Sequence, residues 1–181
     1  MASVNDSYEY FRNKTFDLVV ELGTRFGDST LSLCSNATIK RLVTIDPYLR
    51  YEDYKKDGGW DSSTDETYIK TKEKLSQFSN IEMIRDMSAE AVDNFEDNSI
   101  DFLFVDGNHE YDYVLEDLEL YYPKVKSGGV ICGDDYFMNE KAYNRKMVQE
   151  AVNYFSEKYN LELHTQGFHG GYPKNWVFIK P

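Results

Sequence analysis

Carboxylates follow two apolar segments of this sequence, and carboxylates gathered at one place can bind a metal ion or transfer protons. IDFLFVD ends in Asp106, and GGVICGDD ends in Asp134 and Asp135. Both segments have the composition of buried parallel strands. In a doubly wound sheet these strands would be neighbours about 5 Å apart, with their carboxyl ends at the edge where ligands bind. We therefore expect the three carboxylates to converge.

Converging carboxylates repel one another unless a cation lies among them. A site rich in oxygen ligands suits Mg²⁺, Mn²⁺ or Ca²⁺. Such an ion would lower the pKa of a bound hydroxyl group and orient that group for reaction. The alternative is that Asp106, Asn108 and Asp134 only cap turns.

The histidine that follows the first acidic segment is the candidate base. His109 lies three residues after Asp106, whereas His164 and His169 lie near the C-terminus. Imidazole accepts protons near neutral pH, so His109 could take a proton from a reacting group. An exposed loop histidine without a role is the alternative.

A further motif, VVELGTRFGDST, predicts a strand that turns into a helix around two glycines. Gly23 and Gly27 permit a tight turn and a close backbone approach. The turn departs from the dinucleotide-binding fingerprint, because the side chain of Arg25 would crowd a pyrophosphate at the position of the second glycine. Glu21, just before the turn, is placed to bind a cationic ligand. A plain strand-to-helix turn is the alternative.

S-adenosyl-L-methionine fits this turn better than a dinucleotide, because it carries a sulfonium and an ammonium group and no phosphate. Asp46 ends the next apolar segment, about twenty residues on, where an acid can accept hydrogen bonds from both ribose hydroxyls. The segment IEMIRDMS would bring Met87 or Ser88 to an adenine pocket. The alternatives are a strand-terminating acid before Pro47 and an N-cap at Ser88.

Segments of strand and helix type alternate along the chain, which predicts a parallel sheet with helices on both faces. We expect an α/β fold with a Rossmann-like, doubly wound, seven-stranded sheet. It would form one domain over residues 1–181, and a module of a longer chain is the alternative. The Asp28-Ser29 pair offers an N-cap for the second helix. Strands are expected near 17–23, 41–46, 81–85, 100–106, 128–133, 161–165 and 175–179. Helices are expected near 4–13, 28–36, 64–78, 88–95, 111–124 and 140–159.

Composition and charge narrow the classes of partner. The 181 residues are 41% hydrophobic and carry a formal net charge of −12, which repels nucleic-acid phosphates and anionic lipids. No apolar stretch approaches the length of a membrane span, and the N-terminal residues lack the features of a signal peptide. Cys34 and Cys132 form neither a disulfide nor a zinc pattern. We expect a cytoplasmic protein that binds neither nucleic acid nor membranes.

The longest irregular segment, YLRYEDYKKDGGWDSS, covers residues 48–63 directly after the second expected strand. A loop of this length inside a compact domain is more often functional than idle. Tyr48, Tyr51 and Trp60 would cover a substrate or, alternatively, pack the loop onto the surface.

Taken together, residues 17–136 resemble the class I S-adenosylmethionine-dependent methyltransferases. The run SIDFLFVDGNHEYDYVLEDLELYYPKVKSGGVICGDDY is similar to the family of macrocin-type sugar O-methyltransferases and cephalosporin-hydroxylase-like proteins, and its acids are placed as in catechol-type enzymes. The resemblance implies a final antiparallel strand, NWVFIK, and a divalent ion, usually magnesium, held by Asp106, Asp134 and Asp135. Asn108 stands where this motif often has an acid.

The resemblance also implies which residues contact the cofactor. They are Glu21, Gly23, Thr24, Ser29, Asp46 and Ser88, to which we add Met87 and Asp106. We assign the catalytic roles to His109, Asp106 and Asp134.

These expectations combine into transfer of a methyl group from S-adenosyl-L-methionine to a hydroxyl of a sugar, a glycan or a related small molecule. A hydroxyl is a poor nucleophile until it is deprotonated, so the acids and His109 favour oxygen over nitrogen as the acceptor atom. A catechol-type phenol is the alternative acceptor. The alternatives of other classes are a nicotinamide-dependent oxidoreductase and a non-catalytic cofactor-binding or scaffold protein. The sequence leaves a homodimer open.

Overall fold

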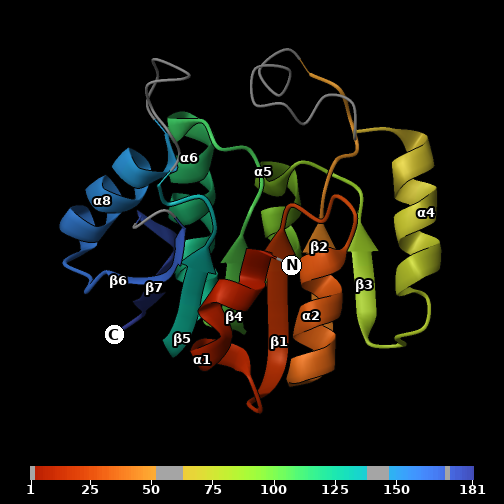
Figure 1. Cartoon of the computed structure of the whole chain (residues 1–181), viewed down its shortest axis with the longest axis horizontal. Helices are drawn as coiled ribbons and strands as arrows, with labels where there is room; N and C mark the ends of the chain where they lie inside the picture. Colours follow the sequence, from red (N-terminus) through yellow and green to blue (C-terminus); the bar gives the residue numbers. More distant parts are fainter. Residues whose placement is uncertain (1–2, 52–62, 138–146, 170–171) are drawn as a thin grey trace.

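A seven-stranded sheet forms the centre of the structure, a computed structural model that describes residues 3–51, 63–137, 147–169 and 172–181 (Figure 1). The strand order is β3-β2-β1-β4-β5-β7-β6. β7 is antiparallel to both of its neighbours, and all other pairs are parallel. The α/β fold with an antiparallel last strand is therefore confirmed. The strands are β1 (Thr15–Leu22), β2 (Thr38–Ile45), β3 (Ile81–Ile84), β4 (Ile100–Val105), β5 (Val125–Gly133), β6 (His164–His169) and β7 (Tyr172–Ile179).

Helices cover both faces of the sheet. In Figure 1, α1 and α2 lie in front of the sheet and α4 stands beside the edge strand β3. The helices are α1 (Tyr8–Phe11), α2 (Asp28–Asn36), α4 (Asp65–Leu75), α5 (Ser88–Ala91), α6 (Tyr111–Tyr121) and α8 (Val148–Tyr159), with 3-10 turns η1 (Ser3–Ser7), η2 (Val92–Asn94) and η3 (Tyr122–Lys124). None of the helices within the described ranges is long and apolar enough to cross a bilayer.

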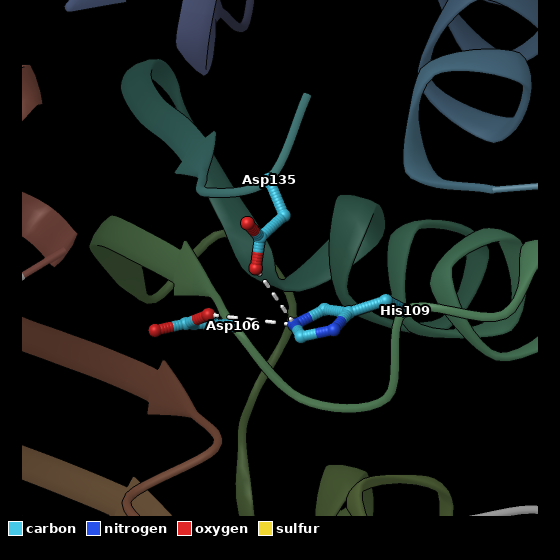
Figure 2. Close-up of side chains that lie close together, drawn as sticks. All are labelled: Asp106, His109 and Asp135. Carbon is cyan, nitrogen blue, oxygen red and sulfur yellow. Dashed lines mark ion pairs between the residues drawn. The ribbon is translucent and has the colours of Figure 1, made fainter. Parts of the chain in front are cut away.

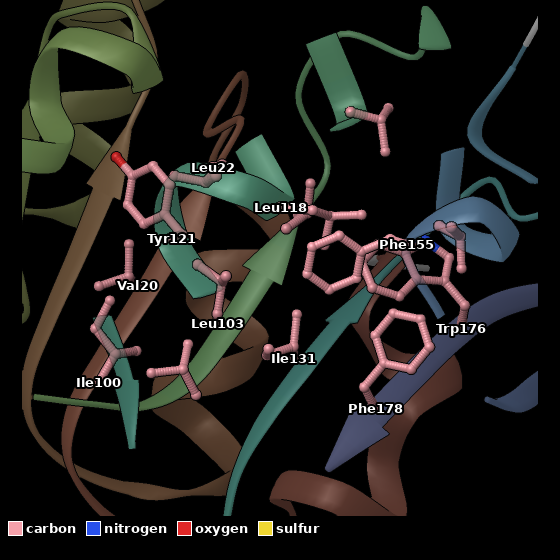
Figure 3. Close-up of a cluster of buried hydrophobic side chains, with 14 of the residues drawn as sticks. Val20, Leu22, Ile100, Leu103, Leu118, Tyr121, Ile131, Phe155, Trp176 and Phe178 are labelled. Atoms are coloured by element: carbon pink, nitrogen blue, oxygen red, sulfur yellow. The ribbon is translucent and has the colours of Figure 1, made fainter. Parts of the chain in front are cut away.

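The central strand β4 shows why the sheet is buried on both faces. Its side chains alternate between two core clusters: Phe102 and Phe104 pack with residues of α1 and α2, while Leu103 and Val105 pack with residues of α5, α6 and α8. Figure 3 shows the second cluster, in which Phe155 packs near the β7 aromatic side chains. Because both faces are covered, an apolar residue is needed at successive positions, which produces the continuous run that predicted this strand.

Three element boundaries differ from the prediction. The expected helix at 4–13 is a 3-10 turn and one short helix, because Arg12 is extended and Asn13 takes a φ of +58°. The strand expected at 161–165 begins at His164, since Leu161 still donates its N–H to the Ser156 carbonyl at the end of α8. Of the helix expected at 140–159, the structure describes 148–159, and 138–146 lie outside the described residues.

Both predicted helix caps are wrong by a residue or more. Gly27, with a φ of +70°, is the N-cap of α2, so that Asp28 and Ser29 already belong to the helix. Met87 is the N-cap of α5, and Ser88 is its first residue. Neither cap residue makes a side-chain hydrogen bond to the helix N–H groups. The hydroxyl of Ser88 donates instead to Asp117 Oδ1.

The turn after β1 is held tightly between β2 and β4. Gly23 donates its N–H to the Ile45 carbonyl, and Asp106 donates its N–H to the Leu22 carbonyl, both at 2.8 Å. Gly23 has a φ of +92°, and a Cβ placed there would lie 2.0 Å from the Asp106 carbonyl oxygen. Only glycine fits this position, because the conformation and the space each exclude a side chain.

We predict that Gly23→Ala destabilises the protein by roughly 3 kcal/mol or more, because a strained backbone and a backbone clash add together. Gly107→Ala is the matched control: a Cβ at that neighbouring glycine would meet only Asp117 Oδ2, at 3.7 Å. Urea denaturation of both variants measures the difference. Equal free energies of unfolding for the two variants would contradict the explanation.

Candidate functional site

A cavity opens at the carboxyl ends of the central strands. In open α/β sheets, ligands bind at this edge. The turns that follow β1, β2, β3 and β4 form its walls together with α6. Its lining residues are Leu22, Gly23, Ile45, Asp46, Pro47, Tyr51, Met87, Ser88, Gly107, Asn108, Tyr113 and Asp117. Of the predicted cofactor residues, Gly23, Asp46, Met87 and Ser88 are therefore in this wall.

Asp46 is held in the cavity wall by backbone hydrogen bonds. Its Oδ2 accepts the Arg25 N–H and its Oδ1 accepts the Tyr48 N–H, each at 2.8 Å. Burial raises the pKa of Asp46, and these bonds oppose the shift. Each carboxylate oxygen keeps a further lone pair, so the group can still accept hydrogen bonds from a ligand with two hydroxyl groups.

Glu21 lies beneath the glycine turn and is fully buried. Its Oε2 accepts the hydroxyls of Thr30 and Thr44, and Thr24 in turn donates to Thr44 at 2.6 Å. Its Oε1 has no hydrogen-bond partner among the residues that the structure describes. Burial raises the pKa of Glu21 to about 8, although the two hydroxyls oppose the shift. A nearby cation would stabilise the ionised form.

Two expectations about side chains near the turn are wrong. Arg25 does not crowd the cavity, because its guanidinium lies over the Phe26 ring, 5.1 Å from the centroid. Tyr48 does not cover a substrate; it is buried, and its hydroxyl donates to the Arg25 carbonyl. Tyr51 lines the cavity, so its contact with a substrate stays a prediction, and Trp60 lies outside the described residues.

A cluster of charged side chains lies at the ends of β4 and β5, which pair in register (Figure 2). His109 Nε2 is 3.1 Å from Asp135 Oδ2 and 3.7 Å from Asp106 Oδ1. One ligand atom from each of these three residues lies within 4.8 Å of the others, a spacing that a metal ion could bridge. Of the three carboxylates predicted to converge, Asp106 and Asp135 lie in this cluster together with His109, whereas Asp134 is not part of it.

Asp134 lies beside this cluster but is more deeply buried than its partners. Burial and the charges of Asp135 and Asp106 raise the pKa of Asp134 to about 7. Its Oδ1 has no hydrogen-bond partner among the described residues, and its backbone carbonyl accepts the Trp176 indole N–H. Because no described donor is paired with Oδ1, this oxygen could bind a cation. The role of Asp134 in a metal site stays a prediction.

The remaining predicted cofactor residues are absent from the cavity lining. Thr24 is buried with its hydroxyl on Thr44, and the Ser29 hydroxyl accepts the Val4 N–H at 3.4 Å. The other two are Glu21 and Asp106. Contact of these four residues with the cofactor stays a prediction.

Sequence reasoning missed Tyr113 and Asp117, both in the cavity wall. A signal for Asp117 exists: it lies on the buried face of α6 with Val114, Leu118 and Tyr121. A carboxylate at helical spacing among apolar residues is unusual, because its burial disfavours the charged form.

Comparison with known proteins begins with the family described as "Methyltransferase domain", whose profile matches residues 20–136. Protein R132 of Acanthamoeba polyphaga mimivirus is 36% identical over 122 residues, which cover 65% of this chain and 50% of that protein. Protein y4gI of Sinorhizobium fredii is 29% identical over 126 residues, or 69% of this chain and 14% of that protein. The chain thus spans half or less of the length of these relatives.

Solved structures share the fold at low sequence identity. A "putative rRNA-methylase" from Clostridium thermocellum superposes with a TM-score of 0.70 at 17% identity, covering 99% of this chain and 96% of that one. A "putative methyltransferase" from Streptococcus mutans in complex with SAH gives 0.68 at 14%, covering 100% and 99%. A "putative caffeoyl-CoA O-methyltransferase" from Staphylococcus aureus gives 0.67 at 16%, covering 92% and 77%.

We predict that Glu21→Gln changes the pH dependence of stability of the ligand-free protein. The folded pKa of about 8 lies above the ordinary glutamate value of 4.5, so the stability contributed by the neutral carboxyl group is fully present below pH 4.5 and is lost as the pH rises through 8. The variant lacks this loss, and its stability relative to wild type should rise across that window by up to about 5 kcal/mol. Thermal denaturation between pH 5 and 9 measures the change.

Glu90→Gln is the control for this experiment, because Glu90 is exposed on α5. Its difference from wild type should stay constant over the same pH range. If the difference for Glu21→Gln were equally constant, the carboxyl group would not be perturbed by burial.

Proposed function

The chain belongs to the methyltransferase domain family, and from this premise we propose that it transfers a methyl group from S-adenosyl-L-methionine to a hydroxyl group. We propose a sugar, a glycan or a related small molecule as the acceptor. The observation that carries the proposal is a cavity at the carboxyl ends of the central strands, with the His109 cluster at the ends of two of them. A methyl donor and a proton acceptor can thereby act on one bound hydroxyl.

The cavity suits the donor chemically. Its apolar walls, among them Leu22, Ile45 and Met87, can contact the adenosyl group, and Asp46 can accept hydrogen bonds from the ribose. Glu21 supplies negative potential beneath the turn, where a sulfonium and an ammonium group would be favoured over phosphate. This fit also disfavours a nicotinamide dinucleotide.

His109 supports proton removal from the acceptor. In the proposed reaction the acceptor oxygen forms a bond to the methyl carbon, the carbon–sulfur bond breaks with its electron pair going to sulfur, and the hydroxyl proton passes to imidazole Nε2. The carboxylates of Asp135 and Asp106, 3.1 and 3.7 Å from Nε2, stabilise the imidazolium that results. S-adenosylhomocysteine leaves without the sulfonium charge.

A divalent cation fits the acids of this site. Asp106, Asp134 and Asp135 would hold it. The Oδ1 of buried Asp134, which has no hydrogen-bond partner in the described ranges, supports that assignment. When bound, the ion would lower the pKa of the acceptor hydroxyl and orient it. Carboxylate ligands suit magnesium, manganese and calcium alike, and magnesium is preferred because the resemblance to the metal-dependent methyltransferases implies it.

The acceptor class follows from charge more than from shape. Both a "caffeoyl-CoA O-methyltransferase" and an "rRNA-methylase" have this fold, so the fold leaves small molecules and RNA equally open. The net charge of −12 opposes an RNA acceptor. A catechol-type phenol is the nearest alternative to a sugar as the acceptor.

We propose that the protein acts in the cytoplasm. Its two cysteines, Cys34 and Cys132, are free thiols, as expected in a reducing compartment.

We predict that His109→Gln lowers kcat by roughly 10²- to 10⁴-fold, the usual contribution of a general base. The affinity of the protein for S-adenosyl-L-methionine should stay unchanged. A screen of sugars, glycans and phenols with labelled methyl donor identifies the acceptor, and calorimetry measures donor affinity. His164→Gln, on the distant strand β6, is the control and should keep full activity. Unchanged turnover in His109→Gln would remove the base from the mechanism.

We predict that chelation lowers turnover at least about 10-fold but changes donor affinity less than about 3-fold, because the ion would contact the acceptor and not the sulfonium. Asp134→Asn should reproduce both effects while still binding the donor. Methyl transfer with EDTA is compared with transfer after Mg²⁺ is restored. Equal activity with and without chelator would exclude the ion.

A further inference from the structure

Tyr51 links two walls of the cavity that follow different strands. It comes after β2, whereas Asn108 lies in the turn after β4 and Tyr113 lies in the first turn of α6. Asn108 donates an Nδ2 N–H to the Tyr51 hydroxyl at 3.2 Å, and the ring centroids of Tyr51 and Tyr113 are 6.0 Å apart. All three residues line the cavity. Because β1 lies between β2 and β4 in the sheet, this link passes from one side of β1 to the other.

The segment Pro47–Tyr51, which we call the strap, is fixed at its start. Tyr48 is only 3% exposed, donates its N–H to Asp46 Oδ1 at 2.8 Å, and donates its hydroxyl to a carbonyl of the glycine turn at 2.9 Å. The next two residues, Leu49 and Arg50, are exposed. Backbone rotation at these two positions would therefore move Tyr51 and leave Tyr48 and Asp46 in place, as hinge residues do in loops that close over a ligand.

The turn after β4 orients Asn108 for its contact with the strap. Asn108 is 8% exposed, and its Oδ1 accepts the Glu110 N–H at 2.9 Å. Because that bond occupies the side-chain carbonyl, the amide NH₂ group faces Tyr51. An ionised aspartate at this position could not donate a hydrogen bond to the Tyr51 hydroxyl. Asn108 thus gives the strap a donor that is held in place by its own turn.

The contacts of Tyr51 are strong enough to favour the closed strap and weak enough to break. A single neutral hydrogen bond shifts an equilibrium by a factor of roughly 2 to 10, and a pair of aromatic rings by a similar factor. Tyr51 itself is half-buried, unlike the fully enclosed Tyr48 at the root. The closed strap is therefore one of two accessible arrangements and not a permanent part of the core.

We propose that the strap is a gate over the donor site. Tyr51 closes the cavity over S-adenosyl-L-methionine and separates from Asn108 before S-adenosylhomocysteine leaves. The inference rests on the proposed function, because that function names the ligand of the cavity. The cavity is present beneath the closed strap, with Tyr51 among its lining residues, so the closed arrangement is compatible with a bound ligand. Closure would also keep water away from the sulfonium.

The test measures how fast S-adenosylhomocysteine binds to and leaves the full chain, by surface plasmon resonance. Tyr51→Phe removes the hydroxyl and keeps the ring, so the strap opens more easily with and without ligand. Association and dissociation should both become roughly 3- to 10-fold faster, while Kd changes less than about 2-fold. Tyr51→Ala also removes the ring contact with Tyr113 and should accelerate both rates further.

Tyr154→Phe is the matched control, because it removes the same hydroxyl from a tyrosine that is exposed on α8 and absent from the cavity lining. Both rates should keep their wild-type values in this variant. Faster dissociation with unchanged association in Tyr51→Phe would show that the hydroxyl binds the ligand directly, which would overturn the gate. Unchanged rates together with a lower melting temperature would show that the contact with Asn108 is only structural, which would overturn it as well.

Failure of the gate is distinguishable from failure of the proposed function. If wild type binds S-adenosylhomocysteine and Tyr51→Phe leaves both rates unaltered, the gate is wrong and the proposed donor stands. If wild type does not bind S-adenosylhomocysteine, the proposed donor is wrong, and the gate on that donor is wrong with it.

Discussion

The register of four parallel strands is the constraint on which the whole site depends. Leu22 pairs with both Ile45 and Val105, and Val105 pairs with Gly133, so β2, β1, β4 and β5 end at the same level. The residue after each strand therefore lies at one edge of the sheet. A one-residue slip of any strand would exchange its two faces and remove its last side chain from the site.

This edge concentrates negative charge at a price in stability. Burial raises the pKa values of Glu21, Asp117 and Asp134, which means that it disfavours their ionised forms. Within the described part of the chain, Glu21 Oε1 and Asp134 Oδ1 have no hydrogen-bond partner. A ligand that brings positive charge or hydrogen-bond donors would satisfy these groups, which couples binding to folding stability.

In the glycine turn, backbone groups make the contacts that position Asp46 and allow the approach to Asp106. Gly23 allows the turn to approach Asp106, while the N–H of Arg25 fixes Asp46. Arg25 itself takes a φ of +45°, yet its side chain turns away to Phe26. The residue type at this position thus says little about the ligand, because the backbone group carries the contact and the side chain does not face the cavity.

The sequence by itself determined the α/β class, the seven strands and the approach of Asp106 to Asp135, because apolar runs ending in acids define both parallel strands and the edge where they end. That His109, and not Asp134, completes this cluster was decided by the tertiary structure. Only the tertiary structure decided what depends on packing between distant segments. It placed Tyr48 in the core, turned Arg25 away from the cavity and brought Asp117 from α6 to Ser88. Local pattern records which face of an element is buried, but not which element it will meet there.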